Sequence, residues 1–173
     1  NDYIAMNGNT GEIYVNPTEE VVNNFKELMI KMNNEKLDLE KYKSDKTVTT
    51  ENYKVELVAN IGVPEDSNIA IENTAEGIGL FRSEFLYMDS ETLPTEEEQF
   101  VAYKKVAENM NGKPVIIRTL DVGGDKDIKY LNLEKEDNPF LGYRAIRISL
   151  DNQELFKTQL RALLRASHFG KVY

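Results

Sequence analysis

From Tyr53 onward, short apolar runs alternate with segments that carry helix start and stop signals, and this alternation restricts the fold more than any other feature. The runs lie at residues 55–60, 78–81, 115–117 and 172–173. Strands that alternate with helices are typical of βαβ units, whose strands pair in parallel within one sheet. We therefore expect an α/β fold with a parallel sheet over residues 51–173.

The segments between the runs have recognisable helix boundaries. Thr95 and Glu98 have the spacing of a capping box, and Asn111-Gly112 is a typical end for the helix that would follow. Further helices are predicted to begin at Asn138-Pro139 and at Asp151-Asn152, the second ending at His168-Phe169-Gly170.

The length of this region corresponds to part of a barrel. A (βα)8 TIM barrel needs about 250 residues, and residues 51–173 supply about half of that number. The pattern therefore predicts three strand–helix units and the start of a fourth strand, which is a partial TIM barrel. Such a half barrel would leave a sheet edge and apolar faces uncovered, so we expect it to oligomerise or to repack.

The first residues predict a β-hairpin that precedes a long helix. Residues 3–6 and 13–15 are apolar and flank a turn rich in asparagine and glycine. Because an isolated hairpin buries too little to be stable, residues 1–16 are expected to be the end of a larger domain. Asn16 is the predicted N-cap of the following helix and Pro17 its first residue.

Apolar residues recur at helical spacing from Val21 to Tyr42. This pattern favours an amphipathic helix docked along a neighbouring element, with a self-associating coiled coil as the alternative. Residues 17–50 would then be a linker helix and connector.

The formal net charge of −9 argues against nucleic acid and against a membrane surface as partners, because both are anionic. The sequence has no cysteine, which fits a reducing cytoplasm. In so acidic a chain, an anionic ligand would have to be held by a few converging cations.

Arg82 and Arg118 are the cations with the most informative positions, because each follows an apolar strand run directly. In a parallel barrel both would emerge at the carboxyl ends of the strands, where barrel enzymes bind their ligands. Guanidinium groups suit phosphate and carboxylate because they donate paired hydrogen bonds. The alternative is that each arginine only pairs with a nearby carboxylate such as Glu84 or Asp121, but the repetition on successive strands favours anion binding.

Other candidates give weaker signals. Arg144 lies on the helix predicted from Asn138-Pro139, and spacing alone does not separate it from Arg147. Gly123-Gly124 could let backbone amides approach an anion, with Lys126 adding a charge, although such pairs are often simple turns. His168, the only histidine, is interpreted as a helix-end packing residue.

Taken in order, several long segments resemble enzyme I of the bacterial sugar phosphotransferase system, the phosphoenolpyruvate-protein phosphotransferases. The segments are residues 60–62, 76–89, 93–99, 117–126 and 138–147. Pyruvate phosphate dikinases and phosphoenolpyruvate synthases share the theme of residues 77–82, but residues 85–89 and 93–98 look like enzyme I. The resemblance extends over essentially the whole chain.

The resemblance implies a transferase that moves the phosphoryl group of phosphoenolpyruvate to a histidine and on to the carrier HPr, the first step of sugar uptake. It implies that Arg82 and Arg118 hold the phosphate with support from Arg144, while Lys126 and Asn60 are weaker substrate-binding candidates.

Other parts of that enzyme are expected outside this chain. The phosphorylated histidine would lie upstream, and the Mg²⁺ ligands, a further arginine and an acid cysteine downstream. The chain alone would then hold no catalytic residue and be inactive, whereas the intact enzyme would be a cytoplasmic homodimer. A dikinase or synthase piece, and a non-catalytic assembly module that uses the long helix, are the alternatives.

Overall fold

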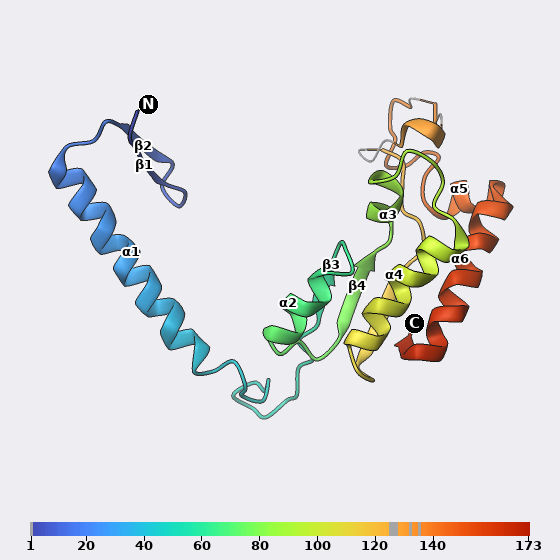
Figure 1. The fold of residues 1–173 in the computed structure, drawn as a ribbon, viewed down its shortest axis with the longest axis horizontal. Coiled ribbons are helices and arrows are strands. Elements are labelled where there is room, and N and C mark those ends of the chain that lie inside the picture. Colours follow the sequence, from blue (N-terminus) through green and yellow to red (C-terminus); the bar gives the residue numbers. More distant parts are fainter. Residues whose placement is uncertain (1, 125–127, 132, 135) are drawn as a thin grey trace. The chain divides into compact units, whose positions relative to one another are not determined.

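The computed structural model describes residues 2–124, 128–131, 133–134 and 136–173 (Figure 1). The chain divides into two compact units, Asn1–Lys46 and Thr47–Tyr173, and each is described by itself. Within the described residues, no helix combines the length and the apolar character that a membrane crossing requires.

The first unit contains the predicted hairpin and the predicted long helix. Strands β1 (Ile4–Asn7) and β2 (Glu12–Val15) pair antiparallel, and helix α1 spans Glu19–Glu40. The helix packs on the hairpin through an edge-to-face contact between Tyr14 and Phe25, whose ring centroids are 5.8 Å apart. No residue of α1 is buried, so its apolar side chains remain largely exposed within this unit.

The helix starts two residues later than predicted, because Asn16 belongs to the hairpin. Asn16 has a positive φ of 49°, which asparagine tolerates better than most residues. Its Oδ1 accepts a hydrogen bond of 3.0 Å from the Tyr3 amide, which closes the open end of the hairpin. Thr18 is the N-cap instead, and its hydroxyl accepts a hydrogen bond from the Val21 amide. The prediction of Asn16 as the cap was wrong.

The second unit is built on a parallel sheet, as predicted. Its strands are β3 (Ala59–Ile61), β4 (Ile78–Arg82), β5 (Pro114–Arg118) and β6 (Lys171–Val172), in the order β3-β4-β5-β6. All three pairings are parallel. The first strand begins later than the apolar run at residues 55–60, and its register against β4 shifts between Ala59 and Asn60.

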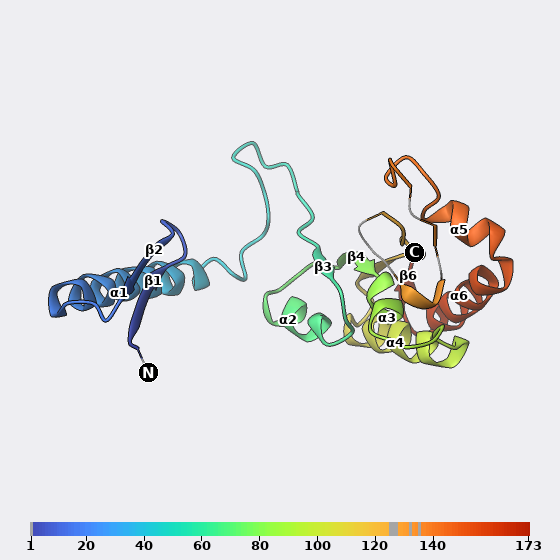
Figure 2. The same ribbon diagram turned by 90° about the horizontal axis from the view of Figure 1, so that it is seen from above.

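Helices α2 (Asp66–Glu72), α4 (Glu96–Asn109) and α6 (Gln153–Ala166) cover one face of this sheet. Figures 1 and 2 show α4 and α6 side by side. The main core lies between this helical layer and the strands; Phe81 of β4 meets Tyr103 of α4 edge to face, with ring centroids 5.8 Å apart. The capping box of Thr95 and Glu98 at the start of α4 is present as predicted.

A second, smaller core cluster includes Leu120 and Val122, which follow the carboxyl end of β5. It also includes Tyr87 from the short helix α3 (Glu84–Met88), and Ile148 from α5 (Ile146–Asp151). The remaining elements are two short 3-10 helices, η1 (Lys129–Leu131) and η2 (Ser167–Phe169).

The helix predicted from Asn138-Pro139 does not start there. The backbone forms a tight turn, in which the Leu141 amide donates to the Asn138 carbonyl at 3.0 Å. The chain then passes through Ala145, whose φ of 49° is incompatible with a helix, and α5 begins only at Ile146. Arg144 therefore lies in a loop before a helix rather than on the helix.

Candidate functional site

Arg82 and Arg118 are the last residues of β4 and β5, and they are register partners in the parallel ladder. Register partners of a parallel sheet project their side chains from the same face. The residues before them, Phe81 and Ile117, are buried in the core under the helices. Because successive side chains alternate between faces, the two arginines leave the sheet on the opposite face, next to each other.

Among the described residues, an aromatic ring rather than a carboxylate holds the Arg82 side chain. Its guanidinium carbon lies 4.6 Å from the centroid of the Phe85 ring, a cation–π arrangement. Within the described part of the chain, no carboxylate forms an ion pair with Arg82, and its buried Nε has no hydrogen-bond partner.

Gly62, just beyond β3, makes room for this stack. A Cβ atom at Gly62 would lie 3.2 Å from Phe85 Cδ2 and 3.5 Å from Arg82 Nη2. Any larger residue would therefore push on the phenyl ring under Arg82.

Arg118 is held by two carboxylates, as the alternative interpretation of its position anticipated. Its Nη2 forms a short ion pair with Glu84, whose side chain is completely buried. Its Nη1 lies 3.1 Å from Asp121 Oδ2. About a third of the Arg118 side chain is still exposed. These pairs restrict the orientation of the guanidinium group while leaving part of it accessible to a ligand.

Asp121 also connects Arg144 to the cluster. Arg144 Nη2 lies 2.8 Å from Asp121 Oδ1, so one carboxylate bridges two guanidinium groups. Arg144 reaches the strand ends as expected, although it does so from a loop. With Arg82 included, three cations meet two anions, because Glu84 is the other carboxylate of the cluster. Counted over the described residues alone, the cluster has one more cation than anion, within an acidic chain.

Gly123 and Gly124 bring the loop after β5 against Arg144. Gly123 has a φ of +104°, and a Cβ atom there would lie 2.8 Å from Arg144 Cβ and 3.1 Å from the Tyr143 carbonyl oxygen. The Ala145 amide donates a 3.0 Å hydrogen bond to the Val122 carbonyl, which joins the same two segments. Gly123 and Gly124 therefore allow the loop after β5 to pack closely against the loop that carries Arg144.

The structure separates the weaker candidates. Asn60 is exposed on β3 and pairs with Leu80, so it lies on the same face as Arg82 but two residues earlier along the strand direction. Lys126 lies outside the described residues. Arg147 is exposed and donates to the carbonyls of Leu141 and Gly142.

His168 lies in η2, just before the amino end of β6, and its ring contacts Phe169. It is therefore not part of the arginine cluster, which lies at the carboxyl ends of the strands.

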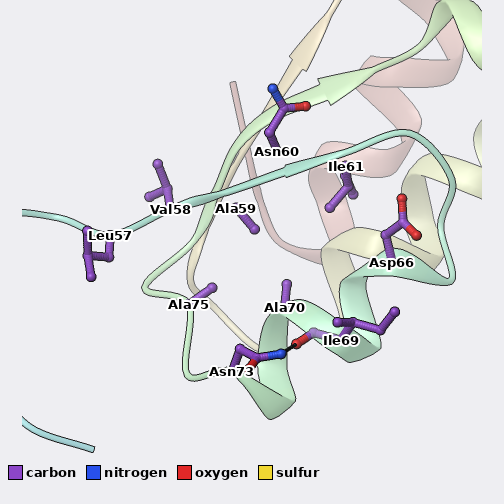
Figure 3. Close-up of a pocket in the computed structure, with 10 residues that line it drawn as sticks. All are labelled: Leu57, Val58, Ala59, Asn60, Ile61, Asp66, Ile69, Ala70, Asn73 and Ala75. Atoms are coloured by element: carbon purple, nitrogen blue, oxygen red, sulfur yellow. Dashed lines mark hydrogen bonds between the residues drawn. The ribbon is translucent and has the colours of Figure 1, made fainter. Parts of the chain in front are cut away.

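A groove of about 490 Å³ lies beside β3, on the side that faces α2. Figure 3 shows its apolar wall, which includes Ile61 and Ala70, and shows the Asn60 amide on the side of the strand away from α2. Asp66 accepts hydrogen bonds from the amides of Gly62 and Val63 at its rim. The groove is mainly apolar, so it is a less suitable place for a small anion than the arginine cluster.

Sequence reasoning missed a buried polar network directly beneath the cluster. Gln159 of α6 is fully buried and its side chain reaches Ser83, Tyr103 and the backbone of Leu120. Burial raises the pKa of Tyr103 to about 12, so its hydroxyl keeps its proton at neutral pH. The signal in the sequence is a glutamine in an otherwise apolar helical stripe.

Within the described residues, no group of three or more His, Cys, Asp and Glu side chains is arranged to hold a metal ion. What the described residues offer is a set of guanidinium donors at one sheet edge. Such donors match the oxygens of phosphate and carboxylate groups.

Comparison with known proteins gives a consistent result. Residues 36–173 match the family model described as the PEP-binding domain of PEP-utilising enzymes. The chain is 54% identical over 171 residues to a phosphoenolpyruvate-protein phosphotransferase of Staphylococcus carnosus, and 53% identical over 171 residues to one of Haemophilus influenzae. A third, from Priestia megaterium, is 53% identical over 169 residues. The alignments cover 98–99% of this chain but only 30% of each relative.

Proposed function

Because this chain belongs to the phosphoenolpyruvate-utilising enzymes through the PEP-binding domain that it carries over residues 36–173, we propose that it binds phosphoenolpyruvate for phosphoryl transfer. The transfer would run from phosphoenolpyruvate to a histidine outside these residues and on to the carrier HPr, which is the first step of the sugar phosphotransferase system. The names of the relatives favour this reaction over that of a dikinase or a synthase.

The observation that carries the proposal is the pairing of Arg82 with Arg118 at the ends of adjacent parallel strands. A phosphate group has several oxygens that can accept hydrogen bonds at once, and two neighbouring guanidinium forks can bind different oxygens of the same group. Arg144 lies at the same edge because Asp121 joins it to Arg118. Barrel enzymes bind ligands at this end of their strands, which fits our proposal that the sheet is part of a TIM barrel.

In the proposed reaction, this chain positions the substrate and stabilises charge. Phosphoryl transfer places negative charge on the three equatorial oxygens of the moving group. Arg82 would supply most of the local positive charge, while Glu84 and Asp121 would hold Arg118 and Arg144 in place before the substrate arrives. Donors that are already oriented need no reorganisation during the reaction, which is the main source of such electrostatic stabilisation.

Magnesium would assist by neutralising phosphate charge, and we propose that its ligands come from outside these residues. We also propose that the active form is a cytoplasmic homodimer. Asn60, which pairs with Leu80 two residues before Arg82, would contribute more weakly to substrate binding. Lys126 would do the same.

The test is calorimetric titration of phosphoenolpyruvate into the full-length enzyme carrying either Arg82→Ala or Arg118→Ala. Each substitution removes a charged donor, so the dissociation constant should rise by about tenfold or more. Arg147→Ala is the matched control, since among the described residues this exposed arginine donates to the carbonyls of Leu141 and Gly142 and to no carboxylate. Unchanged affinity in both cluster variants would refute the proposed site.

A further inference from the structure

Gln159 connects the segments that follow both arginine-bearing strands. Its Oε1 accepts a 2.9 Å hydrogen bond from the amide of Leu120, two residues after Arg118. Its Nε2 donates a 3.1 Å hydrogen bond to the hydroxyl of Ser83, the residue after Arg82. One side chain from α6 therefore contacts the backbone after β5 and the side chain after β4.

Ser83 completes a direct link between the two strand ends. Its hydroxyl donates a 2.6 Å hydrogen bond to the carbonyl of Arg118 itself. Both Ser83 and Gln159 are completely buried. In a buried site of low dielectric constant, a hydrogen bond is stronger and a lost partner is costly, so this link should hold the strand ends firmly.

The directions of these hydrogen bonds explain why position 159 is a glutamine. The Leu120 amide requires an acceptor. Ser83 already uses its proton on the Arg118 carbonyl and needs a donor, and Tyr103 uses its proton on Gln99 Oε1 and also accepts from Gln159. Only an amide offers one acceptor and two donor hydrogens at this length.

The network continues to the helix that carries the buried carboxylate. Gln99 Oε1 accepts hydrogen bonds from both Tyr103 and Tyr87, at 3.2 and 3.0 Å. Tyr87 lies on α3, the helix that begins with Glu84, the partner of Arg118. The same set of bonds therefore restrains the end of β4, the end of β5 and the carboxylate beneath Arg118.

From these contacts we infer that Gln159 and Ser83 are positioning residues, which set the spacing between the Arg82 and Arg118 guanidinium groups without touching the substrate. This inference rests on the proposed function of the two arginines. Displacement of a positioned group by about 1 Å can reduce catalysis by about 100-fold. Loss of the network should therefore weaken phosphoenolpyruvate binding. The loss of affinity should exceed that of a variant that is equally destabilised but keeps the network.

The experiment compares Gln159→Met with Val106→Ala in the full-length enzyme. Methionine keeps the length of glutamine but removes its donors and acceptor. Val106 is fully buried in the main core and takes no part in the network, so its truncation lowers stability in the same layer. For each variant, calorimetry gives the dissociation constant for phosphoenolpyruvate and thermal unfolding gives the Tm.

Gln159→Met should raise the dissociation constant by about tenfold, the effect of one lost buried hydrogen-bonding partner. Val106→Ala should leave the constant at the parent value while lowering the Tm. If both variants change affinity alike, or if neither does, the positioning role is wrong.

Ser83 gives a second comparison if Gln159→Met does not fold. Ser83→Thr keeps the hydroxyl that bonds the Arg118 carbonyl, whereas Ser83→Ala removes it. We expect the threonine variant to bind phosphoenolpyruvate at close to the parent affinity and the alanine variant about tenfold more weakly. Equal affinities for the two would overturn the inference. Normal binding after Arg82→Ala and Arg118→Ala would instead refute the proposed function.

Discussion

Substitution of Gly123 by alanine should loosen Arg144 and destabilise the second unit. The new Cβ atom would lie 2.8 Å from Arg144 Cβ, closer than such atoms normally approach, and Gly123 has a φ of +104°. A non-glycine residue in a positive-φ conformation costs about 1–2 kcal/mol, and overpacking of a tight contact about 1–3 kcal/mol. The expected loss in the free energy of unfolding is therefore about 2–5 kcal/mol, the sum of these two effects.

Gly112→Ala separates the two contributions. Gly112 has a similar φ of +82°, but an added Cβ atom there would meet nothing within 4 Å. This variant should lose only the conformational part, about 1–2 kcal/mol.

The assay is hydrogen exchange of the Val115 and Ile117 amides, which lie in β5 and report unfolding of the second unit alone. If Gly123→Ala lowers the free energy of exchange of these amides no more than Gly112→Ala does, close packing against Arg144 is not the reason for a glycine at position 123.

Two further outcomes concern α4. Thr95→Ala should remove the capping box with Glu98 and lower the free energy of unfolding by about 1 kcal/mol, measured in urea. Hydrogen bonds from Arg165 and then Arg161 lower the pKa of Glu96 from its ordinary value of 4.5, so their contribution to stability is present above pH 4.5 and is lost as the pH falls through the lowered pKa. Arg165→Ala should therefore lower the Tm at pH 7, and the difference from the parent should shrink towards pH 3; a constant difference would contradict this.

The parallel sheet could be predicted from the sequence because strand and helix signals alternate along one continuous segment. The capping box of α4 could also be predicted, since both of its hydrogen bonds join residues three apart. The starts of α1 and α5 were not, because the decisive contacts are made over longer separations. Asn16 accepts a hydrogen bond from Tyr3 across the hairpin, and Ala145, whose positive φ precedes α5, donates its amide to the distant Val122 carbonyl.

For the candidate site, the sequence indicated which residues would gather but not how they would be held. Arg82 and Arg118 were predictable neighbours because both follow strand runs. Glu84 and Asp121 were recognisable as possible partners, but the sequence did not show that Asp121 bridges two arginines or that Glu84 is buried against Arg118. Gln159 is 76 residues from Ser83, and a lone glutamine in a helix does not reveal which strand end it will reach.

The alignment of Arg82 with Arg118 would also tie the proposed ligand binding to correct strand assembly. Side chains on a strand alternate, so displacing β5 by a single residue would exchange Ile117 with Arg118. The Arg118 charge would then enter the apolar core under α4 and α6, and an isoleucine would occupy the proposed phosphate site. If the proposed site is correct, a sheet assembled out of register would lose both its stability and its phosphoenolpyruvate binding, so binding would report accurate folding.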